Sequence, residues 1–82
     1  TITLIPTWTL GDRLRKAREY AGLTQGELAE AIDVSQRSMS KYEGGKIAPK
    51  RHVLLSWAMC CGVDPVWLRG GIVPAAGPAG AR

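Results

Sequence analysis

The sequence has few of the residues that metal sites, disulfides and membrane spans require. Of its 82 residues, two are cysteines, the neighbours Cys60 and Cys61, and one is a histidine, His52. Adjacent cysteines cannot close an ordinary disulfide, and one histidine adds too few ligands for zinc. The longest uncharged stretches, all shorter than the roughly 18 apolar residues of a membrane helix, are 1–11, 52–63 and 70–81. We therefore expect no metal, no cofactor and no membrane partner, and a location in the reducing cytoplasm.

The chain is also too short for a second domain or a substrate cavity with its own supporting residues. A chain of this size buries roughly 60 % of its unfolded surface, which is enough for one core. Its hydrophobic share of 45 % is ordinary for a folded domain. No nucleophile–base pair, metal cluster or phosphate-binding loop is recognisable in it. We therefore expect one folded domain that is not an enzyme.

Charge is separated along the chain. The formal net charge is +4, and segments 13–18 and 37–51 each carry a net +4, whereas 19–33 carries −4. Such blocks favour a polyanion partner on one face of the molecule. The alternative is a solvated surface on which the charges serve solubility.

Two helices are predicted in the first part of the chain. Apolar residues recur at helical spacing over 9–21, where Thr9 is a candidate N-cap and Gly22 ends the helix in a left-handed turn. Thr24 and Glu27 form a capping box that begins a second helix of about nine residues.

A third short helix is predicted over 36–43. The segment before it contains Asp33, which tolerates a positive φ, and Ser35, which caps the helix. Met39 and Tyr42 are expected to face inward. A pair of glycines at 44–45 stops the helix.

Two more helices follow a loop that reaches Pro49, whose fixed φ suits the first turn of a fourth helix. That helix has a broad apolar stripe and ends at Gly62. Asp64 and Pro65 are an N-cap and a first helical residue, so a single-turn fifth helix is expected over 66–69. In the fourth helix we expect the two cysteines to lie one inward and one near the surface.

The two ends of the chain differ from this middle part. Residues 1–5 have an alternating pattern of β-favouring residue types and could form a short strand or an ordered arm. Residues 1–8 are therefore interpreted as an N-terminal arm, with Trp8 packing over the first helix. Residues 72–82 are rich in Ala, Gly and Pro and are interpreted as a flexible tail or linker. The domain is expected to span 9–71.

The second and third helices, joined by a three-residue break, have the geometry of a helix-turn-helix. The sequence closely resembles the phage-repressor and Cro-like helix-turn-helix family, also called Xre. The family's L-T-Q-x-E-L-A opening, V-S turn, S-x-Y-E-x-G-K ending and later proline are matched at 23–29, 34–35, 40–46 and Pro49. Where the family usually has glycine in the turn, this chain has Asp33. The resemblance covers roughly 10–71 and implies an all-α, compact, five-helix lambda-repressor-like domain.

The same resemblance implies sequence-specific binding to double-stranded DNA, with the helix at 36–43 in the major groove. It also implies that the protein regulates transcription as a phage or prophage-type repressor, which occupies operator DNA in the bacterial cytoplasm. Once the apolar side of that helix faces the core, the polar side chains left outward are Gln36, Arg37, Ser38, Ser40 and Lys41. Glutamine can pair with adenine, and arginine or lysine with guanine. In the family, the positions of Gln36, Arg37 and Lys41 are the usual base readers. The alternative is an ordinary solvated polar face.

Phosphate contacts are expected beside this helix. Lys46, Lys50 and Arg51 follow it in a glycine-rich loop, and Gln25 begins the second helix. Three basic residues of the first helix are interpreted instead as a solvated face, with a marginal phosphate contact as the alternative, and these are Arg13, Arg15 and Lys16.

Arg18 and Glu43 have a different predicted role. The resemblance implies that they form a buried ion pair that supports the loop and does not touch DNA. The alternative is that both side chains are exposed and unpaired.

The family habit of binding palindromic operators implies a homodimer. The sequence offers two dimer surfaces without choosing between them, the fifth helix around Val66, Trp67 and Leu68 and the arm at 1–5. A monomer, or the amino-terminal domain of a longer repressor, stays open as well. A second hypothesis is a protein-interaction module with the same fold, such as an antitoxin that binds DNA only secondarily.

Overall fold

The computed structural model describes residues 8–71, and the regular secondary structure in this range is entirely helical. Its five helices are α1 (Leu10–Tyr20), α2 (Gln25–Ala31), α3 (Gln36–Glu43), α4 (Arg51–Cys61) and α5 (Pro65–Gly70). The expected all-α, five-helix fold is therefore confirmed. All of the predicted N-terminal arm except Trp8, and the predicted tail at 72–82, lie outside the described residues. Between residues 8 and 71 no helix is long and apolar enough to cross a membrane.

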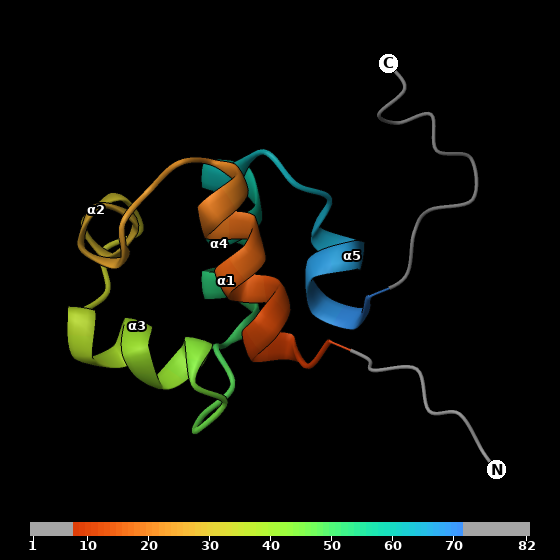
Figure 1. The fold of residues 1–82 in the computed structure, drawn as a ribbon, viewed down its shortest axis with the longest axis horizontal. Helices are drawn as coiled ribbons and strands as arrows, with labels where there is room; N and C mark the ends of the chain where they lie inside the picture. Colours follow the sequence, from red (N-terminus) through yellow and green to blue (C-terminus); the bar gives the residue numbers. More distant parts are fainter. Residues whose placement is uncertain (1–7, 72–82) are drawn as a thin grey trace, which may run out of the picture.

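The helices are arranged around a central pair (Figure 1). α1 and α4 pack against each other, and both also contact α5. α2 and α3 pack against each other on the opposite side of this pair, where α2 also contacts α4 and α3 contacts α1. The helix-turn-helix therefore lies at one end of the molecule and α5 at the other.

The core receives one large side chain from every helix. The five largest fully buried side chains are Leu14, Leu28, Met39, Trp57 and Leu68. Trp57 also satisfies its indole N–H, which donates to the Leu14 carbonyl at 3.1 Å. Because a buried polar group without a partner is costly, this bond lets the largest aromatic side chain occupy the centre between α1 and α4.

The predicted helix starts are confirmed at four caps. Thr9, Thr24, Ser35 and Asp64 each accept a backbone N–H from the first turn of their helix. Thr24 forms the expected capping box with Glu27. α1 has a capping box too, in which Asp12 accepts the Thr9 backbone N–H at 3.0 Å. This bond holds the pKa of the Asp12 carboxyl below its usual value.

The start of α4 differs from the prediction. Pro49 is buried and lies before the helix, the N-cap is Lys50 in an extended conformation, and the first helical residue is Arg51. The carbonyl of Lys50 accepts the N–H groups of Val53 and Leu54 at 2.9 and 3.0 Å. The proline therefore anchors the loop to the core instead of forming the first helical turn.

A glycine allows α1 and α3 to approach each other closely. A Cβ atom built on Gly11 would lie 2.5 Å from the Glu43 carbonyl oxygen, much closer than real atoms approach. Only glycine fits at this crossing, and the position of the α3 carboxyl end depends on it.

Candidate nucleic-acid interface

The turn between α2 and α3 fixes the direction of α3. Asp33 adopts a φ of 60°, as expected for the residue that replaces the family's glycine. The N–H of Val34 donates to the Ala29 carbonyl at 2.9 Å, and Ser35 then caps α3. Ala29, on α2, is only 3 % exposed.

α3 has one face in the core and one in solvent. Met39 is fully buried, and Tyr42 packs its ring edge-to-face on Trp57 with the centroids 6.3 Å apart. On the other side the side chains of Gln36, Arg37, Ser40 and Lys41 are exposed. Ser38 is half-buried, and its hydroxyl lies 3.0 Å from that of the cap residue Ser35.

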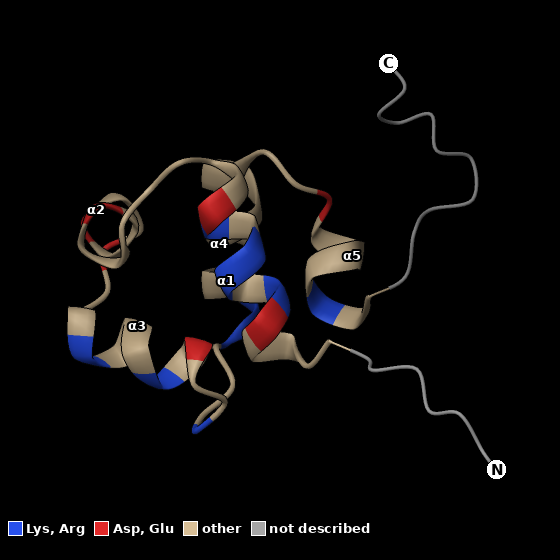
Figure 2. Cartoon of the chain, in the orientation of Figure 1, with Lys and Arg blue, Asp and Glu red and all other residues tan. Residues whose placement is uncertain are grey.

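The acidic and basic segments that flank the turn lie on different helices of the fold (Figure 2). α2 carries only acidic charged residues, whereas α3 and the loop that follows it carry Arg37, Lys41 and Lys46. These three side chains are exposed, as are Lys50 and Arg51 at the start of α4. The solvent-facing part of α3 and the loop behind it therefore have a positive excess.

The loop between α3 and α4 is held by backbone bonds. Gly45 has a φ of 77°, a conformation that favours glycine. The Lys46 N–H donates to the Lys41 carbonyl at 2.9 Å, so the loop turns back beside the end of α3. Lys46 is thereby held next to the exposed face of the helix.

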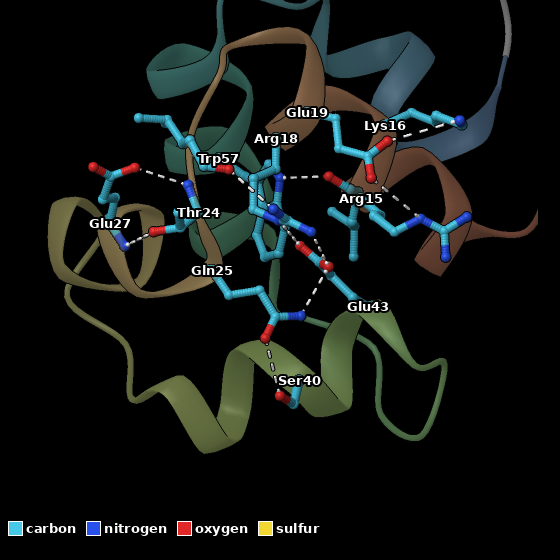
Figure 3. Close-up of polar contacts among 12 residues, drawn as sticks. Arg15, Lys16, Arg18, Glu19, Thr24, Gln25, Glu27, Ser40, Glu43 and Trp57 are labelled. Carbon is cyan, nitrogen blue, oxygen red and sulfur yellow. Dashed lines mark hydrogen bonds and ion pairs between the residues drawn. The ribbon is translucent and has the colours of Figure 1, made fainter.

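An ion pair connects α1 to the end of α3 (Figure 3). The Arg18 guanidinium donates to both carboxylate oxygens of Glu43, at 2.6 and 3.0 Å, and also to the Leu23 carbonyl at 2.9 Å. The two side chains are only 14 % and 5 % exposed. The bond to Glu43 raises the pKa of Arg18 above its ordinary value. This pair sets the angle of α3 relative to α1 and does not reach the exposed face.

Gln25 joins the same network from the start of α2. Its amide nitrogen donates to Glu43 at 3.0 Å, and its amide oxygen accepts the Ser40 hydroxyl at 3.3 Å (Figure 3). Gln25 is half-buried and Ser40 is exposed. Sequence patterns could not reveal this contact, because the two residues lie on different helices.

Arg13 corrects one sequence-based interpretation. It is not part of a solvated face, because its guanidinium donates to the carbonyls of Leu68 and Arg69 at 3.0 Å each and of Trp8 at 2.8 Å. It therefore caps the carboxyl end of α5. Its neighbours on α1, Arg15 and Lys16, are exposed as expected.

The surface of α5 also differs from the prediction. Leu68 is fully buried in the core, so it cannot form part of a dimer contact. Trp67 is half-buried, and Val66 is 41 % exposed. On α4, Cys60 is exposed and Cys61 is buried, as expected, and His52 lies on the surface.

Comparison with known proteins identifies the fold. Residues 9–69, most of the chain, match the family described as a helix-turn-helix domain. The chain belongs to this family. This helix-turn-helix domain is 41 % identical over 69 residues to the transcriptional regulator PrtR of Pseudomonas aeruginosa. The matched residues are 84 % of the chain and 27 % of PrtR. The resemblance to the Xre and Cro-like group is thereby confirmed.

Two other relatives are also named as helix-turn-helix transcriptional regulators. ImmR of Bacillus subtilis is 36 % identical over 62 residues, which are 76 % of the chain and 49 % of ImmR. The regulator of the conjugative element SXT in Vibrio cholerae is 38 % identical over 63 residues, 77 % of the chain and 29 % of that protein. The helix-turn-helix domain thus spans between about a quarter and a half of these relatives. Their names agree with the prediction that the chain is not an enzyme.

Proposed function

We propose that the domain binds double-stranded DNA in a sequence-specific way, with α3 in the major groove, and regulates transcription as a repressor that occupies operator DNA. The observation that carries the proposal is the division of α3 into a core face, with Met39 buried, and a basic, polar face of exposed side chains. The relatives are transcriptional regulators, and one is named for a conjugative element. These names support a transcriptional regulator, and the phage or prophage-type repressor is proposed from the resemblance of the sequence alone.

The proposed base readers are Gln36, Arg37 and Lys41. All three side chains are exposed on α3, and their donors and acceptors match adenine and guanine edges in the major groove. Ser38 and Ser40, the other predicted readers, have hydroxyls that bond to Ser35 and Gln25.

The proposed phosphate contacts lie at both sides of α3. Lys46 is exposed in the loop that follows α3, and Lys50 and Arg51 are exposed at the start of α4, where the N-cap Lys50 makes no side-chain cap bond. The first N–H groups of α4 are therefore suited to an oxygen of the DNA backbone. Gln25 supplies an amide on the α2 side. Loss of one of these lysines should weaken binding about equally on all sequences.

The test compares two variants that lose the same charge. Duplexes selected from a random library by the wild-type chain are titrated by fluorescence anisotropy at several salt concentrations. We expect Arg37→Ala with Lys41→Ala to weaken binding to the selected duplex by at least about 30-fold, because each good base contact discriminates by about 1 to 3 kcal/mol. The control, Arg15→Ala with Lys16→Ala, changes two exposed residues of α1 and should cost less than about threefold.

Two outcomes would reject the proposal. One is a wild-type chain that selects no duplex, or binds with an affinity independent of salt. The other is an equal loss of affinity in the two double variants, because net charge alone would then explain binding.

We further propose that two copies bind one palindromic site, because a single α3 reaches only a few base pairs. Sedimentation of the chain with a selected duplex should give two protein copies per palindrome. One copy per duplex at saturating protein would identify a monomeric reader instead.

A further inference from the structure

The side-chain amide of Gln25 is held at both ends. Its nitrogen Nε2 donates to Oε1 of Glu43 at 3.0 Å, and its oxygen Oε1 accepts from the Ser40 hydroxyl at 3.3 Å. The first contact comes from the end of α3 and the second from its middle, one turn earlier (Figure 3). Two points on α3 therefore orient one side chain of α2.

The chemistry of the partners allows only one orientation of this amide. A carboxylate has no hydrogen to donate, so the Glu43 side must receive Nε2. Glu43 is kept in place by the guanidinium of Arg18, which holds both of its oxygens. The amide oxygen then points to Ser40, whose hydroxyl can donate to it.

One N–H of the amide is left for another acceptor. Nε2 carries two hydrogens, and the bond to Glu43 uses one of them. Gln25 is half-buried, whereas Ser40 is exposed on the same face of α3 as Lys41. The second N–H therefore belongs to a side chain that is already ordered. Because of this order, the side chain loses less conformational entropy when the N–H binds an acceptor such as a phosphate oxygen.

We propose that Ser40 is a positioning residue, which strengthens DNA binding by orienting the Gln25 amide towards the DNA backbone and not by reading a base. This inference rests on the DNA-binding function proposed above. It assigns Ser40 to the sequence-independent part of the interface, in contrast to its neighbours Arg37 and Lys41 on the same helix.

The two roles differ in how affinity changes across DNA sequences. Loss of a base-reading side chain alters the preference for one base pair, whereas loss of a phosphate contact weakens binding to all DNA sequences by the same factor. Ser40→Ala should therefore weaken binding to a selected duplex, its single-base-pair variants and an unrelated duplex by one common factor. One neutral hydrogen bond predicts a factor of about threefold to tenfold.

Coupling to Gln25 gives a second readout. The Gln25→Ala variant should lose at least as much affinity as Ser40→Ala, and the double variant should bind no more weakly than Gln25→Ala alone. Ser40→Thr keeps the hydroxyl and should bind like the wild type. The control is Ser56→Ala, the same chemical change at an exposed position of α4, and it should leave affinity unchanged.

A third readout needs no DNA. In nuclear magnetic resonance spectra of the free, ¹⁵N-labelled chain, the side-chain amide signals of Gln25 should move in Ser40→Ala and stay in place in Ser56→Ala. Equal thermal midpoints for these variants would show that folding is intact.

The proposal is overturned if Ser40→Ala changes the preference among base-pair variants, leaves affinity unchanged, or adds its full loss to that of Gln25→Ala. Unmoved Gln25 amide signals would also overturn it. In each of these cases the wild-type chain still binds DNA and the proposed function stands. A wild-type chain that binds no duplex would instead reject the function and this inference together.

Discussion

The Glu43 carboxylate connects three helices of the site. It accepts two hydrogen bonds from Arg18 and one from Gln25, in a position only 5 % exposed. Its main contribution to the site is the arrangement of the helices, because these bonds fix α1, α2 and α3 relative to one another. A buried ion pair adds little net stability compared with a well-packed apolar pair, but breaking one side of it is costly.

Glu43→Gln should therefore lower the free energy of unfolding by about 3 kcal/mol, because it leaves the Arg18 cation with no carboxylate. Urea unfolding followed by circular dichroism measures this loss. The double variant Arg18→Met with Glu43→Gln should lose less than the sum of the two single variants. Additive losses would show that the two side chains do not interact.

The burial of Cys61 should make the stability of the domain depend on pH. Burial raises the pKa of the Cys61 thiol to about 11, whereas a thiol in an unfolded chain titrates near about 8.5. Because the folded pKa is the higher one, Cys61 contributes full stability below about pH 8.5, and this contribution declines as the pH rises towards 11.

Urea unfolding at several values between pH 7 and 10 tests this dependence. The wild type should lose stability above about pH 8.5, and Cys61→Ala should lose stability with a shallower slope. Identical slopes for the two chains would contradict the burial of Cys61.

At the scale of the helices, the two glycines Gly11 and Gly26 offer a matched comparison. Each is the second residue of its helix, α1 or α2. A Cβ on Gly11 would collide with the backbone of Glu43, whereas on Gly26 its nearest neighbour would be the Gln36 side chain at an ordinary 3.6 Å. The same substitution should therefore have opposite effects.

Gly11→Ala should destabilise the domain by about 2 kcal/mol through overpacking, and Gly26→Ala should stabilise it by about 0.5 kcal/mol by restricting the unfolded chain. Thermal unfolding of the two variants and of the wild type measures these two changes in stability. A Gly11→Ala variant at least as stable as the wild type would mean that α1 and α3 are not in close contact at Gly11.

The helices themselves were predictable because their signals are local. Thr9, Thr24, Ser35 and Asp64 each act within their own first turn, and the residue types alone indicate those caps. The positive φ at Asp33 was likewise expected from its place between two short helices. Pro49 was placed in the first turn of α4 on its fixed φ alone, whereas in the structure it is buried before the helix.

The contacts between helices could not be predicted in the same way. Arg13 caps a helix that lies 55 residues further along the chain, and the Gln25–Ser40 bond joins two helices. No period or motif in the sequence indicates such pairs. The resemblance to a family implied the Arg18–Glu43 pair, whereas for Arg13, whose position matches no motif, the sequence favoured a solvated face.

At the scale of the whole molecule, the charge blocks take different places in the fold. The acidic block begins at the end of α1 and runs through α2 to the turn, whereas the positive block covers the exposed side of α3 and the loop towards α4 (Figure 2). A polyanion would therefore meet the basic face at the helix-turn-helix end of the domain. α5 lies at the opposite end, beyond the central helices (Figure 1).

The most direct test of this account is a nuclear magnetic resonance titration of the ¹⁵N-labelled chain with a selected duplex. We predict that the largest changes in backbone amide signals occur at 36–41 and 46–51, with small changes in the groove between α1 and α5 that Tyr20, Val63 and Trp67 line. Changes concentrated in that groove, with the signals of 36–41 unmoved, would contradict the claim that α3 reads DNA.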